Sequence, residues 1–213
     1  MISNQTDIAI NEPEVLNKSF RAFLLGVEDV VGNSAMRGIL RQAQLVQYID
    51  NYPPANGEHG GHRQIYISQL NRVLFDIYGA RGSRAILQRV GRVQASAMMD
   101  QDAHVTAAVK MAFKLAPQRL KAKLLLDRAA LEIGIRMNTA PKVHEEGGFY
   151  FYDDSACPYC IDWRHDTAVC FTVMGFLREV LRRIGEIDDA KIEEITCRAK
   201  GDASCRFRIA LAE

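Results

Sequence analysis

Apolar residues recur every three or four positions through the first two thirds of the chain, a pattern typical of helices that bury one face. Ser34 and Ser83 are suitable capping residues, Gly79 ends one apolar stripe, and Pro117 interrupts another. The pattern therefore predicts helices over residues 13–31, about 34–50, 64–78, from 83 onward, and from Asp102 onward with a kink or restart at Pro117.

The last third of the chain changes to an alternating pattern that predicts strands. Residues 142–154 predict two strands joined at Gly147–Gly148, and 191–199 and 204–212 predict two more. Between these pairs, Asp166 can cap a helix that ends at Gly185. The expected fold is α+β, with a helical N-terminal part followed by an antiparallel sheet that one helix crosses.

The richest Pro/Gly stretch, residues 51–62, predicts a linker. It divides the chain into an N-terminal helical arm, 1–62, and a main domain, 63–213. Two helices are too few to fold alone, so we expect the arm to pack on the main domain or on a second copy. This favours a homodimer.

Composition narrows the class of protein. With 213 residues, 48% apolar and 25% charged, the chain can form one packed domain with an appendage. Its 27 basic and 26 acidic residues argue against a dedicated nucleic-acid binder. No run of 18 apolar residues predicts a membrane span, and the first residues do not resemble a secretory signal. We therefore expect a cytoplasmic protein that does not enter membranes.

The cysteines indicate the chemistry. All five lie in the last third of the chain, namely Cys157, Cys160, Cys170, Cys197 and Cys205. An odd number of clustered cysteines without a secretory signal favours metal binding or thiol chemistry over disulfides.

One assignment places a metal between a helix and a hairpin. Cys170 is expected on the apolar face of its helix, and a turn can bring Cys197 opposite Cys205. With Glu194 as the fourth ligand these residues suit a closed, structural zinc site. Strict alternation, however, puts Glu193 on the face of Cys197, so Glu194 needs a bulge or strong twist to reach inward.

Two alternatives use the other cysteines. Cys157, Cys160, His165 and Cys170 have the spacing of a zinc knuckle, a nucleic-acid-binding module, although the glycines of such a knuckle are absent. Cys157 and Cys160 also form a Cys-x-x-Cys pair that suits redox chemistry, without the strand-then-helix start of a thioredoxin-like unit.

The C-terminal segments AVCFTVMGFLREVLRRIG and EEITCRAKGDASCRFRI resemble the vinyl-reductase (4-vinyl-reductase-like, hydrocarbon-binding) domain family. The likeness is specific over about 165–210 and looser over 78–92. It implies a fold shared with trafficking-complex subunits and haem-nitric-oxide-type sensors, a dimer, and an apolar cavity. Related sensor domains of phenol-responsive transcription activators imply zinc bound by Cys170, Glu194, Cys197 and Cys205, which favours Glu194 over Glu193.

The resemblance implies a zinc-stabilised binding, sensor or carrier domain for a small hydrophobic or aromatic molecule, such as a tetrapyrrole intermediate of bacteriochlorophyll synthesis. Candidate ligand-binding residues are Phe149, Phe151, Trp163, Phe171, Met174, Met111 and Phe113. No dinucleotide or phosphate-binding fingerprint and no catalytic residues stand out, so binding is favoured over catalysis. The alternatives are a vinyl-group reductase or its accessory subunit, with electrons from a partner or a Cys157/Cys160 centre, and a zinc-knuckle nucleic-acid binder.

Overall fold

The computed structural model describes residues 13–101 and 103–212. Its helices and strands are, in chain order, β1 Glu14–Leu16, α1 Asn17–Val31, α2 Asn33–Gln42, β2 His59–Arg63, α3 Ile65–Gln101, α4 Ala103–Phe113, α5 Gln118–Met137, β3 Lys142–Glu146, β4 Phe149–Asp154, α6 Phe171–Gly185, β5 Lys191–Thr196 and β6 Cys205–Ala210. Short 3-10 turns span Val46–Tyr48, Pro158–Cys160 and Arg198–Lys200.

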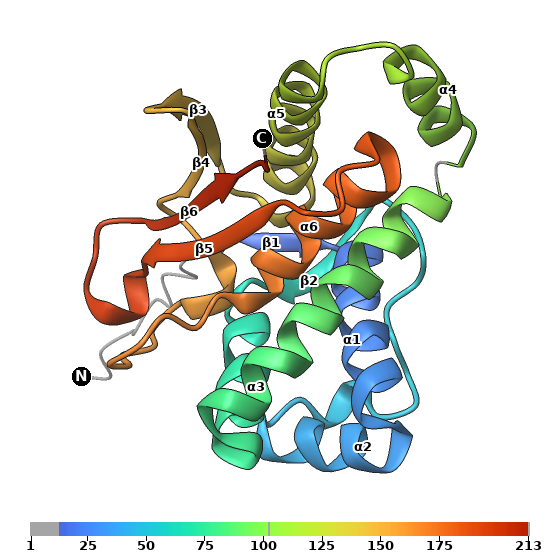
Figure 1. The fold of residues 1–213 in the computed structure, drawn as a ribbon. Coiled ribbons are helices and arrows are strands. Elements are labelled where there is room, and N and C mark those ends of the chain that lie inside the picture. Colours follow the sequence, from blue (N-terminus) through green and yellow to red (C-terminus); the bar gives the residue numbers. More distant parts are fainter. Residues whose placement is uncertain (1–12, 102, 213) are drawn as a thin grey trace, which may run out of the picture.

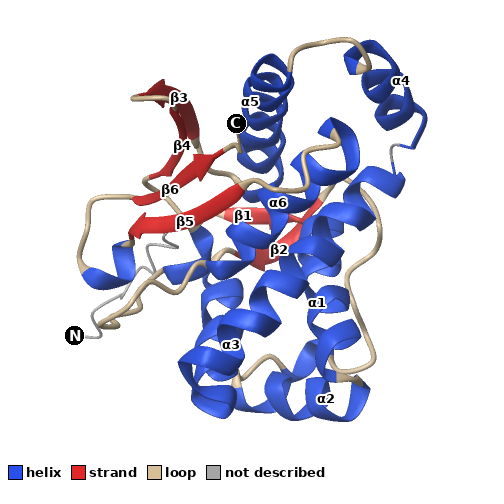
Figure 2. Ribbon diagram, in the orientation of Figure 1, coloured by secondary structure: helices blue, strands red, loops and turns tan. Residues whose placement is uncertain are grey.

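The strands of the second half form a four-stranded antiparallel sheet in the order β3-β4-β6-β5. Figure 2 shows this sheet on one side of the molecule and most of the helices on the other. Tyr152 of β4 pairs with Phe207 of β6, and both side chains are buried. The expected α+β class, with a helical N-terminal part and an antiparallel sheet, is confirmed.

The helices α3 and α6 cross at very short range because each has a glycine at the crossing. A Cβ at Gly91 would lie 2.0 Å from the carbonyl oxygen of Thr172, and a Cβ at Gly175 would lie 2.0 Å from that of Gln88. The helix α1 packs on α3, and one apolar core joins these helices to α5 and the sheet. In the described part of the chain, no helix is both long and apolar enough to cross a membrane.

The start of the chain differs from the expected pattern. Helix α1 begins at Asn17, not Pro13, because Glu14–Leu16 pair as β1 with β2. This second strand, His59–Arg63, lies at the end of the stretch expected to be a linker. Gly60 permits the close approach, since a Cβ there would lie 2.3 Å from Oδ1 of Asn17.

The central helices are interrupted at the residues where the sequence predicts interruptions, Gly79 and Pro117. The two helices expected before and after Gly79 form α3, whose backbone is non-helical at that glycine, with φ 65°. At Pro117, where a kink or restart is expected, the helix restarts: α4 ends at Phe113, and Pro117 is the N-cap of α5. Asp102, the expected cap of that helix, and residues 1–12 of the expected arm lie outside the described residues.

Helix α6 begins at Phe171, five residues after the expected cap Asp166. The intervening segment is held by the terminal hairpin instead of by helical hydrogen bonds. The backbone N–H of His165 donates to the carbonyl of Ala199 at 3.0 Å, and that of Cys170 donates to Glu194 at 2.9 Å. Cys170 therefore lies at the N-terminus of α6 and not within its apolar face.

Candidate functional site

All five cysteines converge in one buried cluster. Cys157 and Cys160 come from the turn after β4, Cys170 from the N-terminus of α6, and Cys197 and Cys205 from the hairpin formed by β5 and β6. Figure 1 shows this hairpin beside α6. The cluster thus joins three segments that are separate in the sequence.

The spacing of the sulfur atoms suits a tetrahedral thiophilic ion. The Sγ of Cys170 lies 3.6 Å from that of Cys205, 3.6 Å from that of Cys157 and 3.9 Å from that of Cys197. The Sγ atoms of Cys160 and Cys205 are 3.4 Å apart. A tetrahedron with zinc–sulfur bonds of about 2.3 Å has edges of about 3.8 Å. The cluster can therefore hold a metal ion without large rearrangement.

A β-bulge places Glu194 and Cys197 on the same side of β5. Glu194 pairs in regular register with the buried Phe207, whereas Glu193 faces solvent and forms an ion pair with Arg208 at 2.6 Å. The register then shifts between Glu194 and Thr196, so Ile195 is the extra residue and is partly exposed. This extra residue brings Cys197 to the side of Glu194, where strict alternation would place Glu193.

The environment of Glu194 suits a cation. Its Oε2 accepts the N–H of Cys170, while Oε1 is buried without a hydrogen-bond partner among the described residues. Burial, followed by the nearby Cys197, raises the pKa of Glu194 to about 10. Burial likewise raises the pKa of Cys157 to about 12. A divalent ion would reverse both effects by stabilising the anionic forms and displacing their protons.

The backbone around the cluster favours negative charge. The N-terminus of α6 directs its partial positive charge toward Cys170. In the hairpin, the N–H of Arg198 donates to the sulfur of Cys205 at 3.4 Å, and the N–H of Cys197 donates to Asp202 at 2.8 Å. Gly201, with φ 100°, permits this tight turn. The N–H of Arg198 and the N-terminus of α6 partly offset negative charge on the sulfurs, while the bond to Asp202 fixes the turn that carries Cys197.

The structure gathers the cysteines into two overlapping donor groups. Cys170, Glu194, Cys197 and Cys205 form one, the set that the family resemblance implies, and their donor atoms all lie within 4.8 Å of one another. Cys157 and Cys160 form the other group with Cys170 and Cys205. His165, which a zinc knuckle needs, is in neither group, and its Nδ1 contacts Thr167 instead.

The aromatic and methionine side chains expected around a ligand do not share one cavity. Phe149 and Phe151 lie on the outer face of the sheet, under Arg208 and Arg206, and Met111 is 74% exposed. Trp163 is buried against Phe75. Phe171 and Met174 line a cavity of about 430 Å³ beside Glu194, and Phe113 lines a separate groove.

That groove, of about 470 Å³, lies between α3, α4, α5 and α6 and is mainly apolar. It is lined by Ala95, Met98, Met99, Thr106, Val109, Phe113, Leu124, Leu125, Arg128, Ala129, Glu132, Arg136, Phe176, Val180 and Ile184. Only Phe113 of these is among the expected ligand-binding residues. The others escape sequence reasoning because the groove forms where four helices meet, and each stripe alone resembles an ordinary core face.

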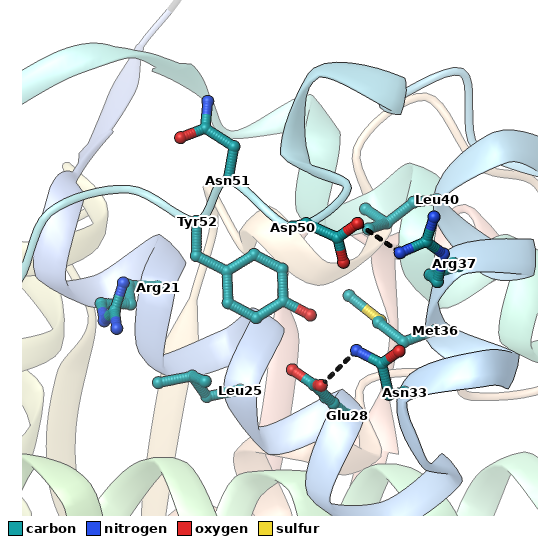
Figure 3. A pocket seen from close by; sticks show the side chains of 10 residues that line it. All are labelled: Arg21, Leu25, Glu28, Asn33, Met36, Arg37, Leu40, Asp50, Asn51 and Tyr52. Carbon is teal, nitrogen blue, oxygen red and sulfur yellow. Dashed lines mark hydrogen bonds and ion pairs between the residues drawn. The ribbon is translucent and has the colours of Figure 1, made fainter.

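A third cavity, of about 370 Å³, is polar. Figure 3 shows Tyr52 between α1 and α2, with Glu28 and Asn33 hydrogen-bonded to each other beside it. Arg37 and Asp50 form an ion pair at the same cavity. Arg21, also in the lining, donates to the carbonyl of Pro53 at 2.9 Å. This polar and charged lining offers little to a hydrophobic molecule.

Comparison with solved structures shows the fold of H-NOX domains. An S. oneidensis H-NOX protein in the Fe(II) state matches with a TM-score of 0.58 and 11% identity, covering 93% of this chain and 96% of that one. The same organism's H-NOX protein in the Fe(II)NO state gives a TM-score of 0.55 and 13% identity, covering 91% and 99%. An H-NOX variant from T. tengcongensis matches with a TM-score of 0.56 and 10% identity, covering 93% of this chain and 98% of that one.

Sequence comparison gives one family. No curated protein sequence matches the chain significantly. The family model of the vinyl-4-reductase (V-4-R) domain matches residues 154–211, the segment that contains all five cysteines, α6 and the β5–β6 hairpin. Residues 154–211 therefore match the V-4-R domain, the vinyl-reductase-like family that the cysteine pattern indicates.

Proposed function

We propose that this chain is a metal-stabilised sensor or carrier domain that binds a small hydrophobic molecule in the groove between α3, α4, α5 and α6. The observation that carries the proposal is the apolar lining of this groove. Its volume of about 470 Å³ is in the range of small-molecule sites, which are mostly apolar with a few polar groups. Arg128 and Glu132 supply such polar groups among the lining residues.

The groove and the cysteine cluster share helix α6. Phe176 and Val180 of this helix line the groove, while Cys170 lies at its N-terminus. Cys170 and Phe176 are six residues apart, which corresponds to about 9 Å along a helix axis. A metal that fixes the N-terminus of α6 would therefore also hold the groove wall in place.

We assign the metal as structural zinc held by Cys170, Glu194, Cys197 and Cys205. Three buried sulfurs and one carboxylate form a closed tetrahedral set, which leaves no position for a substrate. The unpartnered Oε1 of Glu194 supports this set, since an ion at the centre of the four donors would satisfy it. Zinc would supply folding free energy and no chemistry of its own here.

The H-NOX neighbours include haem proteins in nitric oxide and oxygen complexes. Among the described residues that line the groove of this chain, there is no histidine, cysteine or tyrosine to bind haem iron. An organic molecule held by apolar contacts, including a metal-free tetrapyrrole intermediate, fits the lining better than haem. A homodimer remains a further part of this proposal.

Native mass spectrometry of freshly purified protein tests metal, small molecule and oligomer together. We expect zinc, a co-purified apolar molecule and a dimer. Groove occupancy is tested by titrating anilinonaphthalene sulfonate, a fluorescent apolar probe. Val109→Trp fills the groove from α4, and we expect at least tenfold weaker probe binding.

Ala108→Trp is the matched control, since Ala108 is exposed on the same helix and outside the groove lining. The control should bind the probe as the unmodified chain does. Equal probe affinity in both tryptophan variants would show that the groove is not the binding site.

A further inference from the structure

The cysteine cluster contains more ligands than one ion needs. Two four-ligand groups meet in it, and only Cys170 and Cys205 belong to both. The first group is completed by Glu194 and Cys197, and the second by Cys157 and Cys160. A single tetrahedral ion uses four donors, whereas two ions that share two ligands need six, the number present here.

We propose that the chain binds two divalent ions of the zinc class, bridged by the thiolates of Cys170 and Cys205. This inference deepens the metal site of the proposed function and rests on it. One ion is held by the bridging pair with Glu194 and Cys197. The second is held by the same pair with Cys157 and Cys160.

The distances around the shared pair support two tetrahedra with a common edge. The Cys170–Cys205 edge is 3.6 Å. Cys157 lies 3.6 Å from Cys170, and Cys160 lies 3.4 Å from Cys205. Each is close to the edge of about 3.8 Å that a zinc–sulfur tetrahedron requires. Cys157 and Cys160 thus each lie one tetrahedral edge away from a bridging cysteine.

The charge of the loaded cluster is compatible with two ions. Fully ionised, the five thiolates and Glu194 carry six negative charges in a buried volume. Two divalent ions would leave a net charge of two negative units, the same excess as in an ordinary four-cysteine zinc site. The N–H of Arg198 and the N-terminus of α6 offset part of that remainder.

The test counts ions in the full chain. The protein is stripped with a chelator under reducing conditions, reloaded with zinc, and measured by native mass spectrometry and elemental analysis. We expect two zinc ions per chain, and one in the Cys157→Ser/Cys160→Ser double variant. Ser155→Ala is the matched control, an exposed neighbour of the pair, and should keep two.

Cadmium NMR of the unmodified chain needs no variant and remains decisive if the double variant does not fold. Two resonances split by mutual coupling through the bridging sulfurs are expected. One zinc per chain, unchanged in the double variant, would overturn the second ion and leave the single site of the proposed function intact. Three results would overturn both the second ion and the single zinc site of the proposed function. They are one zinc that depends on Cys157 and Cys160 but not on Glu194, iron with labile sulfide, and a chain that binds no ion.

Discussion

The close crossing of α3 and α6 gives the sharpest test of how the fold supports the site. Gly175→Ala adds a methyl carbon 2.0 Å from the carbonyl oxygen of Gln88, where ordinary contacts begin at 3.4 Å. The group it meets is backbone, so no side-chain rotation relieves the clash, and the helices must separate by more than about 1 Å. Overpacking of this kind costs about 1–3 kcal/mol, occasionally more, and we expect about 3 kcal/mol.

For a domain of this size, about 3 kcal/mol lowers Tm by about 6–12 °C. Gly91→Ala meets the carbonyl of Thr172 at the same crossing and should cost a similar amount. Because either methyl separates the same two helices, the double variant should cost about 1 kcal/mol less than the sum of the single variants. Separation also moves Cys170, so zinc retention should weaken.

Thermal unfolding followed by circular dichroism, with zinc and after chelation, measures these effects. Gly38→Ala is the matched control, since Gly38 lies in helix α2 with nothing within 4 Å of its added Cβ. There the reduced freedom of the unfolded chain should stabilise by about 0.4–1 kcal/mol. If Gly175→Ala unfolds at the temperature of the Gly38 variant, the helices do not cross as closely as these contacts require.

Further predictions concern the cluster. Cys205→Ala should lose zinc and lower Tm by at least ~10 °C, because the closed site contributes folding free energy; an unchanged Tm would exclude a structural metal. Glu194→Gln should weaken zinc retention in a chelator competition. Glu193→Gln loses only the exposed ion pair with Arg208, so it should retain zinc and change stability by less than about 1 kcal/mol. The reverse result would assign the ligand to Glu193. Because burial raises the pKa of Glu194 from 4.5 to about 10, the folded apoprotein keeps a proton that the unfolded chain has released, so apoprotein stability should fall as pH rises between these values. Denaturant titrations at a series of pH values should show a smaller loss of apoprotein stability in Glu194→Gln than in the unmodified chain. An equal loss would exclude Glu194 as the source of the pH dependence.

Local pattern determined much of the architecture. The order of helices and strands from α3 onward, the break at Gly79, the turn at Gly147–Gly148 and the buried face of β6 all follow from periodicity and from glycines placed where turns occur. Such signals are encoded within a few residues, because the backbone preferences that produce them are local. Recognition of the V-4-R segment likewise needed only local motifs: the cysteine before Gly-Phe-Leu of α6, Glu-x-x-Cys, the glycine turn and Cys-x-Phe of the last hairpin.

Tertiary structure decided what the local pattern left open. One extra residue at Ile195 brings Cys197 to the same side of β5 as Glu194. The backbone N–H of Cys170 donates to that glutamate, and α6 begins only at the next residue. The same packing brings Cys157 and Cys160 to the other three cysteines, and four helices together form the apolar groove. Sequence alone did not join Cys157 and Cys160 to the other three cysteines, and it named only Phe113 of the groove lining. The reason is that the convergence of distant segments depends on long-range contacts that no local pattern records.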